Sequence, residues 1–293
     1  MFKKYLMLLL FAHVLGDFYA QTSEMAKKKR DSFKWVMIHA LTYWGVMFLV
    51  SVPVLSKQTF AFATISAVLH MVIDILKHRC NVNAKTRGKG LDPVRGTKVF
   101  FVDQALHVLS NVLLAYLFAV QNSQIIALGE IYKIFETTGI SALGLLTWAL
   151  IILVIHKPAN IAISRLLQHY KPSNQDEDGL KEDDQNKDSS QKCIQDKDSS
   201  QKCIQDKGRI KKDNQDENNL KEDKNAGRLI GTLERMIIVI LISLKQYSAI
   251  GLVLTAKSIA RYDKITKDAA FAEYYLLGTL LSTLSVIAIS VIL

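Results

Sequence analysis

Long apolar segments constrain this chain more than any other feature. They lie near residues 5–21, 35–55, 59–77, 99–120, 140–157, 229–244, 247–261 and 272–292. Most approach the length of about 20 residues that a helix needs to cross a bilayer, and hydrophobic residues make up 49% of the chain. The sequence therefore predicts an all-α, polytopic helical membrane protein with about eight transmembrane helices, and excludes a soluble globule.

Positive charge in the connecting segments predicts how these helices are oriented. Five Lys/Arg residues lie within residues 26–34, seven within 77–98 and four within 257–267, whereas each alternate connection holds one lysine. Cytoplasmic loops are the ones enriched in Lys and Arg. The three basic segments are therefore predicted to be cytoplasmic, with both termini outside. The expected partners are the lipid bilayer and its anionic headgroups, and no nucleic acid is expected.

Two segments admit an alternative structure. Residues 236–257 could form one long helix, but this would place Lys245 at mid-membrane and move the following basic residues to the outer side, so a tight hairpin near Lys245 is predicted. The first segment could be a cleavable signal peptide. Asp17 and Phe18 argue against this, because they interrupt the apolar run and the cleavage motif.

A polar segment interrupts the apolar pattern over residues 172–226. The stretch from Lys171 to Arg228 holds 15 of the 27 acidic and 13 of the 37 basic residues, and the decapeptide KDSSQKCIQD occurs twice in tandem within it. Such a composition cannot bury enough apolar surface to offset its chain entropy. It predicts a disordered cytoplasmic linker, for which a solvated tether is favoured over a docking motif for a soluble partner.

The predicted organisation has four parts. They are an N-terminal four-helix membrane domain (1–120), a fifth transmembrane helix region (121–171), the repeat-containing linker (172–226) and a C-terminal membrane region of about three helices (227–293).

Histidine and aspartate residues inside the apolar segments carry the functional prediction. Three segments each hold a His and an Asp four residues apart, which places the pair on one helix face, and a fourth segment begins near a further histidine. These residues are His13, Asp17, His39, His70, Asp74, Asp103 and His107. With the predicted orientation, all of them lie in the cytoplasmic half of the membrane.

These residue types are ligands for transition metals. Neutral imidazole and carboxylate bind zinc, iron or manganese, and helical bundles hold such ions between facing helices. A single histidine in a membrane helix is more often an interhelical hydrogen-bond partner, but a carboxylate in hydrocarbon needs a strong partner. The seven residues are therefore a candidate metal site, with a divalent zinc, iron or manganese ion as the candidate cofactor.

The strings that hold these residues resemble a known family. AHVLGDFYAQT, IHALTYW, LHMVIDILKHR and FVDQALHVLS are similar to the bacterial membrane proteins grouped as domain of unknown function 3307, over roughly residues 1–120. The string GRLIGTLERMIIVILISLKQYSAIGLVLTAKSIARY is similar to a C-terminal extension of many members. The resemblance implies a bacterial inner-membrane location and no particular activity. In kinds of residue, without an alignable motif, the chain is also similar to membrane-bound metal-dependent hydrolases.

Three functional hypotheses follow. The first is a metal-dependent hydrolase at the cytoplasmic membrane face, in which Asp17, Asp74 and Asp103 act as ligands or general bases and Lys77 stabilises developing negative charge. The second is a transporter or ion- or proton-conducting protein that uses the same His/Asp cluster as a relay. The third is a non-catalytic membrane scaffold whose linker recruits a soluble partner. For such a relay, the polar residues predicted in the outer half of the membrane are only Ser51, Ser110, Asn111 and Thr147.

Charged residues also mark other helix ends. Glu234, Arg235, Lys257, Arg261 and Glu273 are predicted to lie at cytoplasmic ends of the last three helices, where ion pairs that lock these helices are favoured over substrate binding. A second group could bind phosphate headgroups, although it lacks a phosphate-loop pattern. It consists of Arg87, Lys89, Arg95 and Lys98, with glycines between them.

Overall fold

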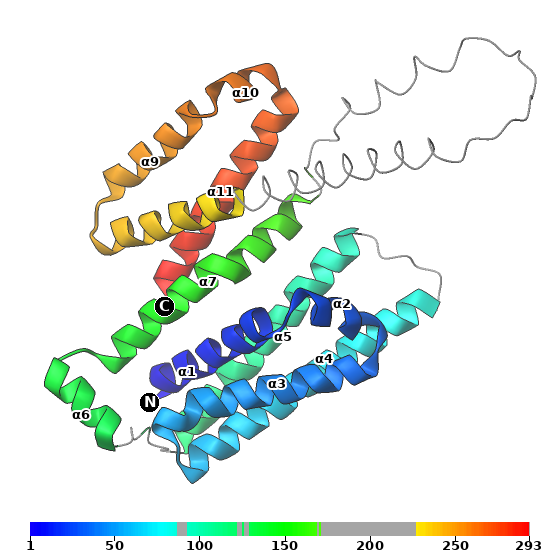
Figure 1. Cartoon of the computed structure of the whole chain (residues 1–293), viewed down its shortest axis with the longest axis vertical. Helices are drawn as coiled ribbons and strands as arrows, with labels where there is room; N and C mark the ends of the chain where they lie inside the picture. Colours follow the sequence, from blue (N-terminus) through cyan, green and yellow to red (C-terminus); the bar gives the residue numbers. More distant parts are fainter. Residues whose placement is uncertain (87–92, 122–124, 126–128, 169, 171–226, 293) are drawn as a thin grey trace, which may run out of the picture.

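The computed structural model describes residues 1–86, 93–121, 125, 129–168, 170 and 227–292, and within these ranges all regular structure is helical (Figure 1). The all-α prediction is confirmed, whereas the predicted linker lies outside the described residues. The helices are α1 (Phe2–Val14), η1 (Leu15–Ala20), α2 (Ser23–Asp31), α3 (Phe33–Ser51), η2 (Val52–Val54), α4 (Lys57–Thr86), α5 (Pro93–Val120), α6 (Gly129–Thr138), α7 (Ala142–Leu167), a helix over residues 227–243, α9 (Tyr247–Ile259), α10 (Tyr262–Lys267) and α11 (Ala269–Ile292).

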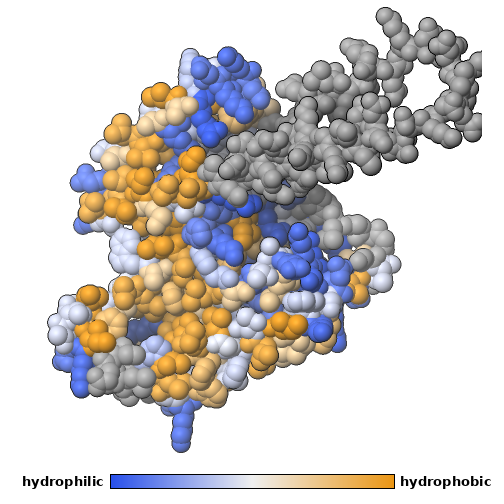
Figure 2. All heavy atoms as spheres, in the orientation of Figure 1, coloured by the Kyte–Doolittle hydropathy of each residue, from blue (hydrophilic) through white to orange (hydrophobic). Residues whose placement is uncertain are grey.

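Five of these helices are long and apolar enough to cross a membrane. The candidate spans are Phe33–Val54, Lys57–Ala84, Val94–Val120, Ala142–Leu167 and Ala269–Val291. The other three predicted segments are shorter or interrupted: α9 has 13 residues, and the first segment changes helix type between α1 and η1. Five candidate spans are therefore found among the described residues, and the count of eight stays a prediction. Apolar side chains cover much of the visible helical surface (Figure 2), as expected for contact with lipid.

The helices alternate in direction as the charge pattern predicts. In Figure 1, α2, the end of α4, the start of α5 and the end of α7 lie toward one side of the molecule, whereas both termini and the connection from α3 to α4 lie toward the other. The helix over residues 227–243 ends at a turn in which Lys245 has a φ of 58°. Figure 1 shows the chain reversing there, which agrees with the predicted hairpin.

Local signals at the helix ends explain several boundaries. Ser56 and Thr59 cap α4 reciprocally, since the Ser56 N–H donates to Thr59 Oγ1 and the Thr59 N–H donates to Ser56 Oγ. Pro93 is the first residue of α5, where its missing N–H costs nothing. Two boundaries differ from the prediction: residues 26–34, expected to be a loop, include most of α2, and α7 continues ten residues beyond 157, through Pro158.

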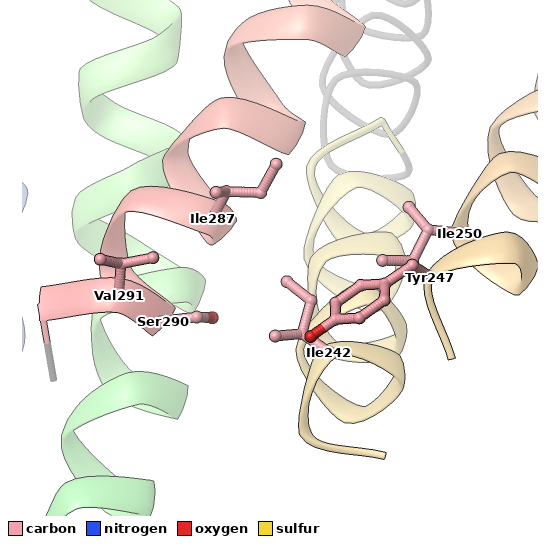
Figure 3. Close-up of a pocket in the computed structure, with 6 residues that line it drawn as sticks. All are labelled: Ile242, Tyr247, Ile250, Ile287, Ser290 and Val291. Atoms are coloured by element: carbon pink, nitrogen blue, oxygen red, sulfur yellow. The ribbon is translucent and has the colours of Figure 1, made fainter. Parts of the chain in front are cut away.

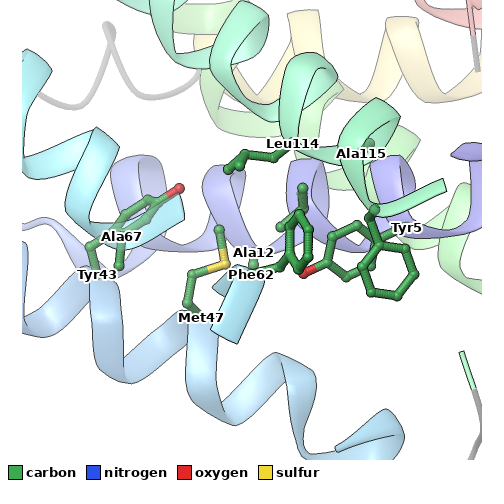
Figure 4. Close-up of a cluster of buried hydrophobic side chains, with 10 residues drawn as sticks. Tyr5, Ala12, Tyr43, Met47, Phe62, Ala67, Leu114 and Ala115 are labelled. Atoms are coloured by element: carbon green, nitrogen blue, oxygen red, sulfur yellow. The ribbon is translucent and has the colours of Figure 1, made fainter. Parts of the chain in front are cut away.

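Aromatic and small side chains pack the core between α1, α3, α4 and α5 (Figure 4). The rings of Tyr5 and Phe118 stack at a centroid distance of 3.9 Å, and Phe62 meets Phe118 edge-on at 5.3 Å. Ala12 and Ala115 are buried in the same cluster. In lipid, such small residues stabilise helix pairs because they let the backbones approach closely.

The C-terminal helices are joined to α7 by a buried arginine. Arg235 is 2% exposed, and it donates hydrogen bonds to the Ile155 carbonyl of α7 (3.1 Å), to Asn160 Oδ1 (2.6 Å) and to Ser282 Oγ of α11 (3.2 Å). Proline in a membrane helix is tolerated where neighbouring side chains bond the backbone around it, and Arg235 does so near Pro158.

Ion pairing in the C-terminal region is narrower than predicted. Lys257 pairs with the buried Glu234, so these two residues lock α9 to the preceding helix. Arg235 bonds neutral groups instead, and Arg261 and Glu273 are exposed. The same helices enclose a mainly apolar pocket of about 290 Å³, which Figure 3 shows between Ile242, Tyr247 and Val291.

Replacement of Arg235 should loosen this junction. We expect Arg235→Leu to lower the thermal midpoint of the detergent-solubilised protein, with a loss of at least about 2 kcal/mol, because buried acceptors on two neighbouring helices lose their donor. Arg261→Leu is the matched control, since this side chain is exposed. Equal midpoints for the two variants would contradict a structural role for Arg235.

Candidate metal centre

The seven predicted ligand residues meet inside the N-terminal helices. They come from α1 (His13), η1 (Asp17), α3 (His39), α4 (His70, Asp74) and α5 (Asp103, His107). Six of them are at most 5% exposed, and the Asp17 side chain is 9% exposed. The rings of His70 and His107 lie 4.1 Å apart between centroids. The fold thus brings together residues that the sequence singled out on four separate segments.

The Asp17 carboxylate lies at the centre of this His/Asp cluster. Its Oδ1 atom is 2.8 Å from His70 Nε2 and 3.1 Å from His39 Nε2, and its Oδ2 atom accepts a hydrogen bond from Gln104 Nε2 at 3.2 Å. These partners belong to α4, α3 and α5. One carboxylate of η1 therefore contacts all three neighbouring helices.

The Asp74 carboxylate is paired with a lysine from outside the membrane helices. Lys29 Nζ donates to Asp74 Oδ2 at 2.8 Å and to Gln21 Oε1 at 3.1 Å. The Lys29 side chain is 12% exposed and that of Asp74 is 1% exposed. His39 Nε2 lies 3.4 Å from the same Asp74 oxygen. Helix α2 thus covers the cluster and neutralises one of its carboxylates.

Helix α2 is itself well capped. The Thr22 hydroxyl accepts a hydrogen bond from the Met25 N–H at its start. Glu24 and Lys28 form an ion pair one turn apart, and the hydrogen bond from Lys28 lowers the pKa of Glu24. His78 of α4 is hydrogen-bonded to the Lys29 carbonyl at 3.1 Å. These contacts fix the helix that places Lys29 over the cluster.

The third carboxylate, Asp103, is only partly partnered. Its Oδ2 atom forms an ion pair with Lys77 of α4. Its Oδ1 atom is buried without a hydrogen-bond partner among the described residues and lies 3.6 Å from His107 Nε2. Lys77 and Asp103 therefore join α4 to α5, and one carboxylate oxygen stays free to accept a proton or a ligand.

A π-helical turn places Asp17. Residues Leu15–Ala20 form η1, a rare helix type that often occurs at functional sites. A Cβ atom added to Gly16 would lie 2.5 Å from Tyr43 Cδ2, so the close approach of η1 and α3 requires glycine. The Tyr43 ring packs on His70 at 3.6 Å, and its hydroxyl lies 3.4 Å from His13 Nδ1. Glycine at position 16 thus lets Tyr43 reach the histidines.

Several buried nitrogen and oxygen atoms of the cluster have no hydrogen-bond partner within the described part of the chain. They are His13 Nε2, His39 Nδ1, His70 Nδ1, Asp103 Oδ1 and both ring nitrogens of His107. Each such atom costs about 1–3 kcal/mol when it is left unpaired. A neutral imidazole nitrogen with a free lone pair is also a metal ligand. The residues present therefore fit a divalent cation.

Three overlapping groups have ligand atoms within 4.8 Å of one another. They are His13, Asp17 and His70; His39, His70 and Asp74; and Asp74, Asp103 and His107. The first and second groups share His70, and the second and third share Asp74. This arrangement has room for one ion, or for two neighbouring ions.

The spacing of His and Asp did not identify every residue of the site. Lys29 counted in the sequence only as one of five basic residues near the membrane, and nothing there distinguished it from its neighbours. Tyr43 follows His39 by four residues, so the rule that paired the other residues could have found it. The contact between Gly16 and Tyr43 joins two helices and could not be predicted from either one.

The comparisons with known proteins concern the same region. Residues 5–134 match the family described as Protein of unknown function (DUF3307), so this part of the chain is similar to that family. All seven residues of the His/Asp cluster lie within the match. No functionally curated protein and no solved structure matches the chain.

An alanine at position 16 should separate η1 from α3. We expect Gly16→Ala to lower the thermal midpoint through overpacking of about 1–3 kcal/mol, because the Tyr43 ring is held against His70. The matched control is Gly45→Ala in α3, where an added Cβ meets no atom within 4 Å. An unchanged midpoint for Gly16→Ala would show that the two helices separate at little cost.

Proposed function

We propose that the N-terminal region, which is similar to the DUF3307 family, is a divalent-metal-dependent hydrolase that acts at the cytoplasmic face of the bacterial inner membrane. One observation carries this proposal: buried imidazole nitrogens that have no partner among the described residues surround a carboxylate that contacts three neighbouring helices. An uncompensated cluster of this kind is costly in a membrane protein, which favours a functional role over simple packing.

The distances support a particular set of ligands for such an ion. His13 and His70 form one ligand group with the central carboxylate of Asp17. His39 and Asp74 belong to the adjoining group, which shares His70. A bound zinc, iron or manganese ion would polarise an ester, phosphoester or amide bond as a Lewis acid. The substrate class that suits this position is a lipid or another molecule carried in the membrane.

Asp103 is the candidate general base. Its Oδ1 atom is buried and has no hydrogen-bond partner in the described part of the chain, and His107 lies one helical turn away on the same face. Lys77 balances the charge of Asp103 through the other carboxylate oxygen. Lys77 is already paired with Asp103. It would therefore stabilise negative charge on a substrate only if one of its three N–H groups bonded the substrate while another kept the bond to Asp103. Asp74 is paired with Lys29, so its role is mainly structural.

The packing beyond the cluster favours this proposal over transport. The aromatic core of Tyr5, Phe62 and Phe118 fills the bundle at the N-terminal end of α1. The hydroxyl groups of Ser51, Ser110 and Thr147 donate to carbonyls of their own helices. Asn111 is hydrogen-bonded to Ser66 at 3.0 Å. These side chains give a conducted ion no continuous row of free polar groups among the described residues.

Metal content tests the proposal directly. We expect the detergent-purified protein, supplied with zinc, iron or manganese, to retain a stoichiometric amount of one of them. His70→Gln and His13→Gln should lose most of it, because two of the closest nitrogen ligands are removed. Elemental analysis measures the metal, and the visible absorption of a cobalt-loaded sample reports the ligands independently of activity.

His78→Gln is the matched control, since His78 lies outside the three ligand groups and bonds a backbone carbonyl. Its metal content should equal that of the unchanged protein. Hydrolysis of ester, phosphoester and amide substrates in mixed micelles should then be lost in Asp103→Asn while the metal is retained. Absence of any transition metal from the folded, unchanged protein would overturn the proposal.

The cytoplasmic position is tested by cysteine labelling. In a chain whose own cysteines are replaced by serine, Glu24→Cys marks α2 and Gln121→Cys marks the end of α5, and both positions are exposed. An impermeant maleimide should label Gln121→Cys in intact cells, and Glu24→Cys only after permeabilisation, because basic segments stay in the cytoplasm. The opposite pattern would place the His/Asp cluster at the outer face.

A further inference from the structure

A second polar site lies between the beginning of α5 and the end of α7. The structure has a pocket of about 240 Å³ at this junction, lined by Val94, Thr97, Lys98, Arg165, Leu166, Gln168 and Tyr170. Its lining includes two cations and no acidic residue among the described ones. The volume is below that of a typical site for a drug-sized ligand and suits a small charged group.

Arg165 is held in this pocket, but most of its N–H groups have no acceptor among the described residues. Its guanidinium lies over the Phe100 ring at 4.7 Å, and Nη1 donates to the Gly96 carbonyl at a long 3.5 Å. The Thr97 hydroxyl donates to the Arg165 carbonyl at 3.3 Å, which ties the end of α7 to α5. A guanidinium has five N–H donors, and the described residues provide an acceptor for only one.

The surrounding charge is positive. Lys98 is exposed beside Arg165, and Arg30 of α2 is close enough to repel the Arg165 guanidinium. The first turn of α5 begins at the same place and contains no acidic residue, so its helix dipole adds to the positive charge. Cations gathered at one point are mutually unfavourable unless an anion lies between them.

The position favours a lipid over a free ion. The pocket lies where two candidate membrane spans end, at the side of the molecule that carries the basic α2 (Figure 1). Leu166, in its lining, is 40% exposed, and the exposed side chains of Phe101 and Val102 follow on α5. A phosphate held by Arg165 and Lys98 would therefore continue into acyl chains that lie against apolar helix surface.

We infer that this pocket, which we call the α5–α7 pocket, binds the phosphate group of an anionic glycerophospholipid. Arg165 offers the planar N–H fork that suits phosphate oxygens, and Lys98 adds a second charge from α5. Binding would hold α7 against the N-terminal domain. This inference does not rest on the proposed hydrolase activity or on a metal in the His/Asp cluster.

Native mass spectrometry of the full chain in detergent tests the inference. Phosphatidylglycerol and phosphatidylcholine are added in separate samples, and the bound lipid is counted for the unchanged protein and for Arg165→Gln with Lys98→Gln. We expect one tightly retained phosphatidylglycerol, with an affinity roughly ten-fold or more lower in the double variant. Phosphatidylcholine should be retained weakly by both.

Arg261→Gln with Lys267→Gln is the control of equal charge change, because both residues are exposed near the basic segment α10. It should retain phosphatidylglycerol like the unchanged protein. Lys98→Gln alone changes an exposed position and can be measured if the double variant does not fold. It should also weaken the retention of phosphatidylglycerol. Equal loss in the control would overturn the inference in favour of general surface charge. Displacement of the lipid by millimolar inorganic phosphate would overturn it in favour of a free-anion site.

Discussion

A carboxylate inside a membrane bundle must be compensated by partners on other helices, and Asp17 imposes this constraint on the N-terminal domain. Two imidazoles and one amide, from α3, α4 and α5, approach its two oxygen atoms. Because hydrocarbon offers no water as a substitute, sliding any of these helices would leave charge or polar atoms exposed to lipid. The interaction that forms the candidate site therefore also sets the register of the helices around it.

The balance of charge within the His/Asp cluster is uneven. Lys29 pairs with Asp74 and Lys77 pairs with Asp103, whereas Asp17 meets two imidazoles and an amide and no lysine or arginine of the described part of the chain. A divalent cation beside Asp17 would supply the missing positive charge without displacing either lysine. This consideration favours the group that contains His13 and His70 as the place of the first ion, and leaves the Asp74 and Asp103 groups to position it or to move protons.

Much of this arrangement could be predicted from the sequence, because spacing along a helix determines which side chains share a face. The pairs four residues apart identified the cluster, and the lysine and arginine distribution agrees with the way the helix ends are grouped. Lys29 was not predicted as part of the site, since nothing in its own segment distinguishes it from the adjacent Lys28. The continuation of α7 through Pro158 was also missed, because Arg235, which donates to the Ile155 carbonyl near this proline, lies 80 positions further along the chain.

The α5–α7 pocket and the His/Asp cluster differ in which parts of the chain form them. The cluster is enclosed by its own helices, whereas Arg165 reaches the N-terminal domain from a helix beyond the matched residues 5–134. Tyr19 of η1 makes the reverse connection, donating to the Leu153 carbonyl of α7. The part of the chain after residue 134 therefore contacts the site-bearing helices through polar groups at both of these places, in addition to the apolar packing of Leu150 against Met7 and Val14.

The π-helical geometry of η1 makes the chain length within this segment a determinant of the site. A π-turn closes its hydrogen bonds one residue later than an α-turn does, so it holds one residue more than a regular helix would need. Deletion of Leu15 or Gly16 would bring His13 and Asp17 from four to three positions apart, which changes the angle between them by about 100° around an ordinary α-helix. An insertion or deletion before Asp17 would therefore change which face of the first helical segment carries the central carboxylate.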